Sequence, residues 1–249
     1  LANRKHSIKK VIIASSRAIY GEGRYKCTVH GLVYPETRTE KDMQEGDFEC
    51  KCPVCEGLIN LLATSESSKI HPSSVYGITK QNQEQMGMTV GKSIGIPVVV
   101  FRYQNVFGPG QSLSNPYTGI LSIFSSLIKN GREINIFEDG NESRDFVYID
   151  DVINATLLGL EKEEANGKVF NVGTGSAVDV LTVANTLVEK FNANTVIKIS
   201  GNYRLGDIRH NFADNEKIKT TLGFSPKVSF EDGIDTFVKW VNHQNIYND

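Results

Sequence analysis

The sequence predicts an α/β protein with a parallel sheet, and three observations support this fold class. Short apolar segments rich in β-branched residues, at 9–15 and 96–101, are typical of strands buried on both faces. Helical segments alternate with such strands, which is the order of a parallel sheet with crossover helices. The chain has 249 residues, 39% of them hydrophobic, so it can bury on the order of 70% of its unfolded surface.

The expected elements follow in chain order. A strand at 9–15 precedes residues 21–68, where the periodic pattern breaks down and we expect an inserted loop or small module. A helix at 76–92 and a strand at 96–101 follow, and residues 105–119, rich in Gly, Pro, Ser and Asn, form a loop. The remaining elements are a helix at 120–129, strands at 133–137 and 145–149, a helix to about residue 160 capped by Asp150 or Asp151, a strand at 168–172, a helix at 180–191, a strand at 195–199, and helices at 217–222 and 230–240.

Composition excludes several classes of function. A net charge of -2 and a pI of about 6.3 do not favour binding to nucleic acid or to an anionic membrane. No apolar segment approaches the roughly 20 residues that cross a bilayer. All four cysteines lie between positions 27 and 55. In a chain with this much core, clustered cysteines favour metal binding or redox chemistry over a disulfide scaffold, so we expect a cytoplasmic protein.

A catalytic constellation is indicated by Tyr76 and Lys80, whose spacing places both side chains on one helix face. A free tyrosine hydroxyl ionises at about pH 10, and an ammonium one turn away stabilises the phenolate. Ser15 and Ser16 end the first strand, where α/β sheets bind ligands, and a serine there can share the proton of a substrate alcohol. The alternative is a partly exposed surface pair, but the serines favour catalysis.

Five motifs occur in a fixed order: residues 15–21 (SSRAIYG), 76–80 (YGITK), 102–109 (RYQNVFGP), 143–152 (SRDFVYIDDV) and 170–175 (FNVGTG). This series resembles the extended short-chain dehydrogenase/reductases, which include nucleotide-sugar 4-epimerases and dehydratases. The resemblance covers nearly the whole chain outside the cysteine-rich segment. It implies a Rossmann-like parallel sheet, a smaller interleaved α/β substrate domain, bound NAD and a nucleotide-diphosphate sugar as substrate.

The resemblance also assigns catalytic roles to individual residues. It implies that Ser16 is the catalytic serine, with Ser15 as the alternative and as a cofactor contact. Tyr76 becomes the acid/base and Lys80 its partner, and both also contact NAD.

The same resemblance assigns the substrate contacts. Asn105, Arg144 and Arg209 are implied to bind the nucleotide sugar, and a guanidinium suits bidentate contact with phosphate. For Arg144, a surface ion pair with Asp145 or Asp151 is the alternative. The loop at 115–119 is a further candidate to contact the sugar or base, with an ordinary surface turn as its alternative.

One motif departs from the dehydratases of this family, which carry an Asp-Glu pair after the catalytic hydroxyl residue. This chain has Arg17 and Ala18 there, and neither is a carboxylate. The resemblance therefore implies NAD-dependent epimerisation at C4 through a 4-keto intermediate, in a homodimer. A net NAD(P)-dependent oxidoreductase or decarboxylase acting on a nucleotide sugar, and a non-catalytic nucleotide-binding fragment, are the alternatives.

Members of this family begin with a strand and a Gly-x-x-Gly-x-x-Gly turn that holds the cofactor pyrophosphate, and no such motif precedes Ser15. We therefore expect that roughly 100 residues of the first half of the Rossmann domain are absent. Residues 1–102 then form the C-terminal part of the NAD-binding domain, with a Cys-rich insertion at about 24–68. Residues 103–249 are mainly the nucleotide-sugar-binding domain, with 146–174 returning to the Rossmann sheet.

The insertion carries a candidate metal site. Cys27 and His30 form one short-spaced pair and Cys52 and Cys55 another, with 21 residues between the pairs. Such pairs suit a closed, tetrahedral structural zinc site, in which Cys50 could replace the histidine. Free or oxidised cysteines in a loop are the alternative. A similar insertion occurs in dTDP-L-rhamnose 4-epimerase-like proteins, which implies a dTDP-6-deoxyhexose as the sugar.

Overall fold

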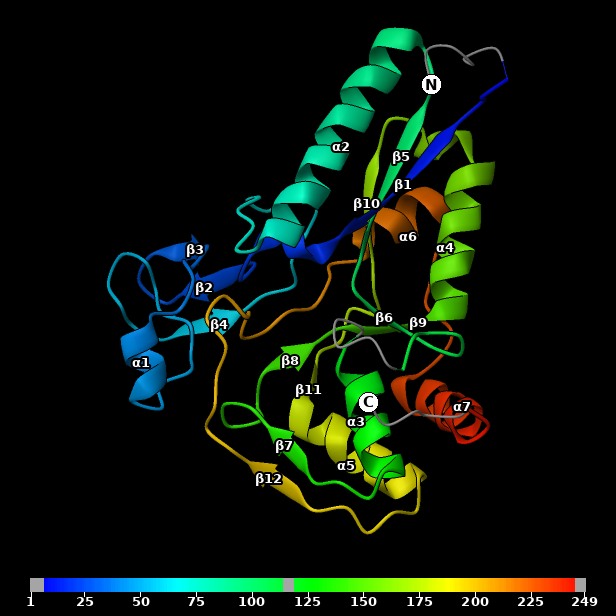
Figure 1. Cartoon of the computed structure of the whole chain (residues 1–249). Coiled ribbons are helices and arrows are strands. Elements are labelled where there is room, and N and C mark those ends of the chain that lie inside the picture. Colours follow the sequence, from blue (N-terminus) through cyan, green and yellow to red (C-terminus); the bar gives the residue numbers. More distant parts are fainter. Residues whose placement is uncertain (1–6, 114–118, 245–249) are drawn as a thin grey trace.

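The computed structural model describes residues 7–113 and 119–244. Its central sheet has three parallel strands in the order β1 (Val11–Ser16), β5 (Val98–Tyr103) and β10 (Val169–Val172). Helices α2 (Val75–Ile94) and α4 (Ile149–Glu161) lie on either side of it (Figure 1). The five residues from Val98 to Arg102 are all buried, as expected for a central strand covered on both faces.

Glycines let the two helices approach the sheet closely. A Cβ added at Gly91 of α2 would lie 2.3 Å from Val98, and one at Gly159 of α4 would lie 2.3 Å from the ring of Phe101. Successive side chains of a strand point to opposite faces of the sheet, so Val98 and Phe101, which are three residues apart, lie on opposite faces. The two helices therefore cover different faces. The close approach of α2 also brings its first turn to the carboxyl end of β1.

A second layer lies in the lower half of Figure 1. Its strands pair in three short sheets: β6 (Asn105–Phe107) with β9 (Phe146–Tyr148), β7 (Ile134–Ile136) with β12 (Ile197–Ile199), and β8 (Ser143–Arg144) with β11 (Val178–Asp179). The helices α3 (Ile120–Lys129), α5 (Val180–Lys190) and α7 (Phe230–Asn242) pack around one buried core that includes Phe107, Phe124, Leu187 and Phe237. The short helix α6 (Glu216–Leu222) packs against β10 instead.

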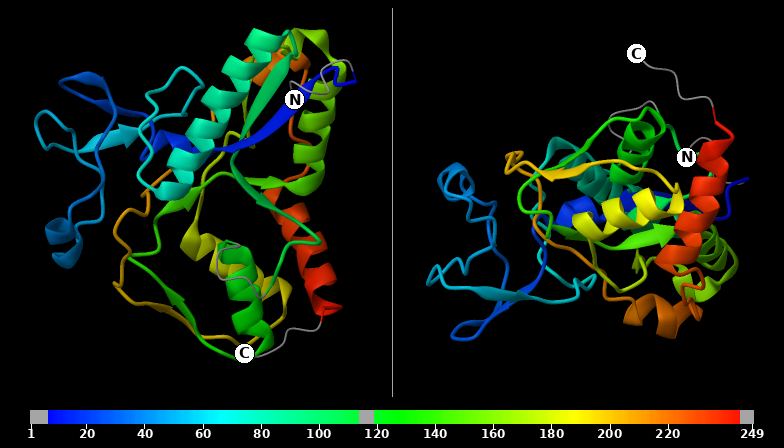
Figure 2. Two further views of the ribbon diagram at one scale, coloured as in Figure 1. Left: turned by 45° about the horizontal axis from the view of Figure 1, so that its top comes forward. Right: turned by 90° about the horizontal axis from the view of Figure 1, so that it is seen from below.

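The Cys-rich insertion projects to one side of the molecule (Figure 2). It contains an antiparallel sheet in the order β3 (Gly31–Val33), β2 (Tyr25–Cys27) and β4 (Ile59–Leu61), and a short helix α1 (Glu40–Gln44). Two 3-10 turns, η2 (Arg17–Tyr20) and η3 (Glu163–Ala165), complete the structure described. The insertion buries a small core of its own, made of Tyr25, Cys27, Val33, Cys50 and Cys52.

The predicted fold class is confirmed, and two local predictions are wrong. The predicted loop at 105–119 contains β6, because Asn105 to Phe107 pair in parallel with β9. Asp151 does not cap α4: its carboxylate accepts hydrogen bonds from the backbone N–H groups of Lys227 and Val228, and the N-cap residue Tyr148 makes no side-chain cap. Residues 114–118 lie outside the described residues, and with them most of the loop predicted to contact the ligand. Within the described part of the chain, none of the helices combines the length and apolarity needed to cross a bilayer.

Candidate functional site

Tyr76 and Lys80 lie on the first turns of α2, and Lys80 reaches back to the end of β1. Its Nζ donates a hydrogen bond to the carbonyl oxygen of Ala14 at 2.9 Å. The same nitrogen lies 5.7 Å from the centre of the Tyr76 ring. Tyr76 is 56% exposed, so a ligand can reach its ring. The structure places the ammonium beside the ring at one end of the parallel sheet.

The turn that carries Ser16 packs against this end of α2. Ser16 accepts a hydrogen bond from the N–H of Ala18 at 3.2 Å, and the carbonyl oxygen of Ala18 lies only 2.6 Å from where a Cβ of Gly77 would be. Ser15, in contrast, is buried, and its hydroxyl donates a hydrogen bond to the Glu84 carboxylate. Because the Ser15 hydroxyl already has a partner in the core, the geometry favours Ser16 as the serine that meets a substrate.

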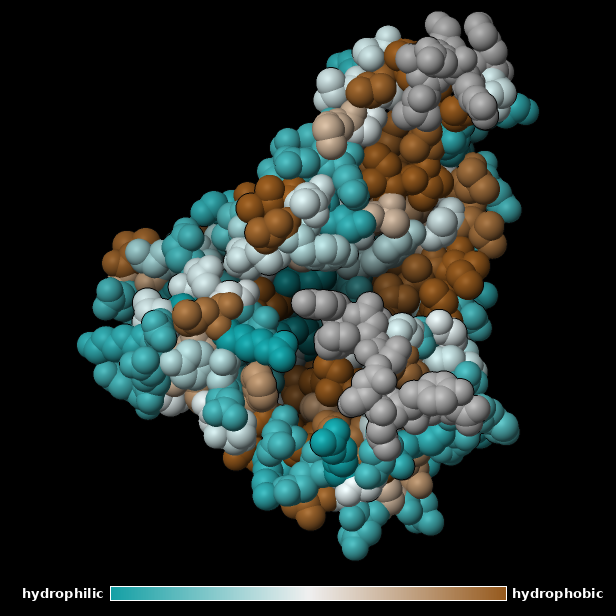
Figure 3. Space-filling model, in the orientation of Figure 1, coloured by the Kyte–Doolittle hydropathy of each residue, from teal (hydrophilic) through white to brown (hydrophobic). Residues whose placement is uncertain are grey.

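A cavity of about 420 Å³ lies in the second layer, between β6, α3, β7 and the segment at 204–207. Figure 3 shows the molecule hollowed between its upper and lower parts. Among the described residues, Ser16, Tyr76 and Lys80 are not part of the cavity lining, whereas two predicted substrate contacts are. The polar lining residues are Asn105, Asn135, Glu142, Arg144, Arg204 and Asp207.

Arg144 is held by carbonyl oxygens rather than by a carboxylate. Its Nη1 donates to the carbonyls of Ser143 and Arg209 at 2.8 and 3.0 Å, and its Nη2 donates to that of Ile208 at 2.8 Å. Burial lowers the pKa of the Arg144 guanidinium. The Asp145 carboxylate, one alternative partner, instead accepts from the backbone N–H groups at 174, 175 and 213. A fixed cation at the wall of a cavity suits an anionic ligand.

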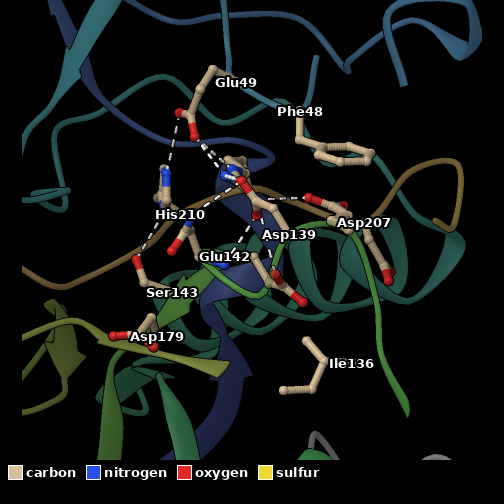
Figure 4. Close-up of polar contacts among 12 residues, drawn as sticks. Phe48, Glu49, Ile136, Asp139, Glu142, Ser143, Asp179, Asp207 and His210 are labelled. Atoms are coloured by element: carbon tan, nitrogen blue, oxygen red, sulfur yellow. Dashed lines mark hydrogen bonds and ion pairs between the residues drawn. The ribbon is translucent and has the colours of Figure 1, made fainter. Parts of the chain in front are cut away.

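Arg209 does not line the cavity, and its predicted role as a substrate contact stays a prediction. It is 1% exposed. Its guanidinium donates at 2.6 to 2.9 Å to three carboxylates, those of Glu49, Glu138 and Asp139 (Figure 4). Arg204 lines the cavity instead, with its guanidinium 5.2 Å from the centre of the Phe137 ring. Both arginines flank Gly206-Asp207, and spacing alone does not tell which of them faces the ligand.

Glu142 is a cavity residue that sequence reasoning missed. It is 8% exposed, and its Oε2 has no hydrogen-bond partner and lies 3.9 Å from Nη1 of Arg209. Burial raises the pKa of the Glu142 carboxyl to about 7, and the negative charge of Glu138 acts in the same direction. The positive charges of Arg144 and Arg209 oppose this rise. The wall of the cavity therefore changes charge near neutral pH.

The four predicted metal ligands come together in the insertion. Their ligand atoms all lie within 4.8 Å of one another. The distance from His30 Nδ1 is 3.6 Å to the Sγ atoms of both Cys27 and Cys52, and the Sγ atoms of Cys27 and Cys55 are 3.9 Å apart. A tetrahedral zinc ion with ordinary bond lengths requires S···N and S···S distances of about 3.6 and 3.8 Å. The arrangement has the size of a zinc site.

The pKa of the thiol distinguishes Cys27, one of the predicted ligands, from Cys50. Hydrogen bonds from the backbone N–H groups of His30 and Val29 lower the pKa of the Cys27 thiol to about 6, so it becomes a thiolate readily. Cys50 is not part of the group of four in the described structure. Burial raises the pKa of its thiol, which disfavours metal binding. In the described structure it is His30, and not Cys50, that lies with the other three side chains.

Three comparisons place this geometry among known proteins. Residues 57–173 match the family model for the NAD dependent epimerase/dehydratase family. The dTDP-L-rhamnose 4-epimerase of Burkholderia thailandensis is 35% identical over 95% of this chain. The structure of UDP-glucose 4-epimerase from Thermotoga maritima with UDP-glucose has a TM-score of 0.74 and 32% identity over 96% of this chain. UDP-glucuronic acid 4-epimerase from Bacillus cereus, in complex with UDP-glucuronic acid and NAD, has a TM-score of 0.74 and 25% identity over 97% of it.

The chain spans 64% of the length of the Burkholderia relative and 65% of each of the two solved structures. The matched segment contains the helix with Tyr76 and Lys80 as well as Asn105 and Arg144. The motifs, the fold and these matches agree, and the chain is similar to members of the NAD dependent epimerase/dehydratase family.

Proposed function

We propose that the protein carrying this chain interconverts C4 epimers of a nucleotide-diphosphate sugar with bound NAD. One observation carries the proposal: Lys80 is fixed to the end of β1 beside the Tyr76 ring, and the turn of Ser16 packs against the same helix end. The cavity with Arg144 and Arg204 adds a place for the diphosphate. The nucleotide sugars and NAD bound to the relatives support the same chemistry.

The chain's own residues divide the proton chemistry. Tyr76 removes the proton of the C4 hydroxyl as the carbon is oxidised, and Ser16 donates a hydrogen bond to the same oxygen. Lys80 stabilises the tyrosinate by its positive charge. Arg144 and Arg204 retain the diphosphate while the 4-keto sugar turns over, and Tyr76 then returns the proton. NAD, when bound, supplies the hydride acceptor and donor at C4.

The fit of NAD to this chain is limited to its nicotinamide end. The Lys80 ammonium has three protons, and its hydrogen bond to the Ala14 carbonyl oxygen uses one of them. The Tyr76 ring is exposed, so both side chains can contact a ribose. The glycine-rich turn that holds a pyrophosphate is not among the 249 residues. Epimerase assays use the protein as the cell expresses it, with NAD added.

Position 17 argues for epimerisation over dehydration. Ser16 is followed by Arg17 and Ala18, so no carboxylate is present at these positions to eliminate water. Arg17 is buried, and its Nη2 donates to the Gly21 carbonyl at 2.6 Å.

A net oxidoreductase or decarboxylase is the second candidate. The test is isomer interconversion of dTDP- and UDP-hexoses, dTDP-6-deoxyhexoses included, with NADH followed at 340 nm. An epimerase consumes no cofactor, and stoichiometric NADH formation would replace this proposal with the second candidate.

Replacing Arg144 with methionine should weaken binding of UDP-glucose or a dTDP-hexose to this chain. A hydrogen bond to a charged group contributes about 1.5–3 kcal/mol, which corresponds to roughly a 10- to 150-fold higher Kd. Isothermal titration calorimetry measures the change. Arg132→Met is the matched control, because Arg132 is exposed and is not a cavity residue. Equal losses in the two variants would contradict a ligand contact by Arg144.

Nucleotide-sugar affinity should fall as pH rises from 6 to 8. Glu142 is neutral below its pKa of about 7 and negative above it, so the diphosphate meets an added negative charge at high pH. Two like unit charges about 8 Å apart repel by roughly 2 kcal/mol at an effective dielectric of about 20 and by roughly 0.5 kcal/mol in bulk water, so Kd should rise by about 2- to 30-fold. UDP-glucose is a suitable probe because its diphosphate does not titrate in this range. Glu142→Gln should flatten the profile, and an unchanged slope would contradict this role.

We further propose that Cys27, His30, Cys52 and Cys55 bind one structural zinc ion. The tetrahedral spacing of the four ligand atoms supports this, as does the small core around them. Location in the cytoplasm and assembly as a homodimer stay predictions.

A further inference from the structure

One side chain of the Cys-rich insertion reaches the wall of the cavity. Arg38 forms a bidentate pair with Glu138, with Nη1 to Oε2 at 2.7 Å and Nη2 to Oε1 at 2.8 Å. Its Nη2 also donates to the carbonyl oxygen of Asp207 at 2.8 Å. Both partners belong to cavity segments, since Phe137 and Asp207 line the cavity. A single guanidinium thus joins segments 137–144 and 204–209.

Glu138 has an unusual backbone conformation for its residue type. Its φ is +51°, in the left-handed region that few residues other than glycine adopt. The residue is 4% exposed, and its carboxylate lies between Arg38 and Arg209. Strained residues of this kind persist where surrounding contacts determine them. The two arginines supply such contacts, and one of them comes from the insertion.

A second link runs from Glu49 through Arg209 to Arg144. Glu49 accepts hydrogen bonds from Nε and Nη2 of Arg209 at 2.9 and 2.6 Å, and its Oε2 lies 3.3 Å from His210 Nε2 (Figure 4). The hydrogen bond with His210, together with those from Arg209, lowers the pKa of the Glu49 carboxyl to about 2, so it is ionised at neutral pH. The carbonyl oxygen of Arg209 in turn accepts from Arg144 Nη1 at 3.0 Å. The insertion is therefore in contact with the residue that supports the candidate phosphate-binding guanidinium.

The links begin close to the four cysteine and histidine ligand positions. Glu49 lies three residues before Cys52, and Arg38 donates to the carbonyl oxygen of Phe48 at 3.0 Å. Phe48 is buried, 6.0 Å from the Arg209 guanidinium. The segment that leads into Cys52 is thus also a segment that contacts the cavity wall.

We propose that Arg38 and Glu49 are positioning residues for nucleotide-sugar binding, which hold segments 137–144 and 204–209 in the shape that presents Arg144 and Arg204. This inference rests on the proposed function for the identity of the ligand. Neither residue lines the cavity, so their effect is on the geometry of the residues that do. Removing one partner of a buried ion pair leaves the other charge uncompensated, so the segments rearrange.

The test compares Arg38→Met and Glu49→Ala with a matched control, Lys51→Met, in the chain as it stands. Lys51 pairs with Asp42 and Asp47 inside the insertion and does not contact the cavity segments. In Arg38→Met and Glu49→Ala, hydrogen exchange should become faster in segments 137–144 and 204–209 and stay unchanged in α2. In Lys51→Met, exchange in segments 137–144 and 204–209 should stay unchanged. The Kd for UDP-glucose should rise by about tenfold or more.

The outcomes separate this inference from the proposed function. Unchanged exchange at 137–144 and 204–209 in both variants overturns the positioning role, whatever the affinity. Suppose that exchange at 137–144 and 204–209 becomes faster in the variants, but the wild-type chain binds no nucleotide sugar. The positioning role is then supported, and the nucleotide sugar is ruled out as the ligand. Glu49 is 45% exposed, so Glu49→Ala is expected to fold even if Arg38→Met does not. In the complete protein, Glu49→Ala should raise KM and leave kcat within about twofold, because Tyr76 is untouched.

Discussion

Tyr76→Phe is expected to reduce kcat for C4 epimerisation by about 100- to 10,000-fold, the usual contribution of a positioned acid/base group. The substitution removes one hydroxyl and keeps the ring beside the Lys80 ammonium. Since Tyr76 is 56% exposed, little packing is lost and the free energy of unfolding should change by less than about 0.5 kcal/mol. Turnover of dTDP- and UDP-hexoses, measured on the protein expressed from its complete reading frame, checks this.

Tyr34→Phe is the matched control for that experiment. Tyr34 lies in the insertion, where its ring contacts the edge of His71 at 6.2 Å between ring centres. The same chemical change there should leave kcat within about twofold, because no proton transfer is lost. A Tyr76→Phe protein that turns over as fast as the Tyr34→Phe protein would remove Tyr76 from the mechanism and leave Lys80 without a catalytic partner.

The strands were predictable where residue type alone determines them. Residues 98–101 (VVVF) are apolar and mostly β-branched, and they form the first part of the buried central strand β5. β6 escaped prediction because it has three residues within a segment rich in Gly and Pro, and it forms only through its pairing with β9. The role of Asp151 was also set by tertiary contact: the chain at Lys227 and Val228 approaches it, and no local pattern reveals that approach.

That Tyr76 and Lys80 lie side by side was predictable because both residues are on one helix, where sequence spacing fixes the geometry. Arg204 and Arg209 could not be separated in this way, since they lie in a loop, and Arg209 pairs with Glu49 and Glu138 from distant parts of the sequence. The signal that could have distinguished them is charge: several carboxylates contact Arg209 in the structure, but they come from segments far apart in the sequence. Glu142 was missed because no sequence pattern shows that a carboxyl will be buried in the wall of a cavity.

Cys52→Ser is expected to abolish zinc binding and to unfold the Cys-rich insertion locally. Structural zinc sites contribute about 10–16 kcal/mol of binding free energy that also serves to fold the segment, and a serine hydroxyl is a poor replacement for a thiolate. The small core around Cys27 and Tyr25 is too limited to replace that contribution. Metal analysis should give one zinc per wild-type chain and none for Cys52→Ser. Hydrogen exchange in 25–61 should become fast in the variant.

Cys50→Ser makes the same chemical change two residues away and should retain the metal, because Cys50 lies outside the group of four. Zinc retained in Cys52→Ser, or lost in both variants, would contradict the ligand assignment.

Loss of the metal should also weaken ligand binding in the cavity. Glu49 and Arg38 contact Arg209 and Glu138, so unfolding the insertion removes two of the charges that hold the segments carrying Arg144 and Arg204. A chelated wild-type chain should therefore bind UDP-glucose as weakly as Arg38→Met does. If the chelated chain binds UDP-glucose with wild-type affinity while residues 25–61 are unfolded, the zinc site does not influence the nucleotide-sugar site.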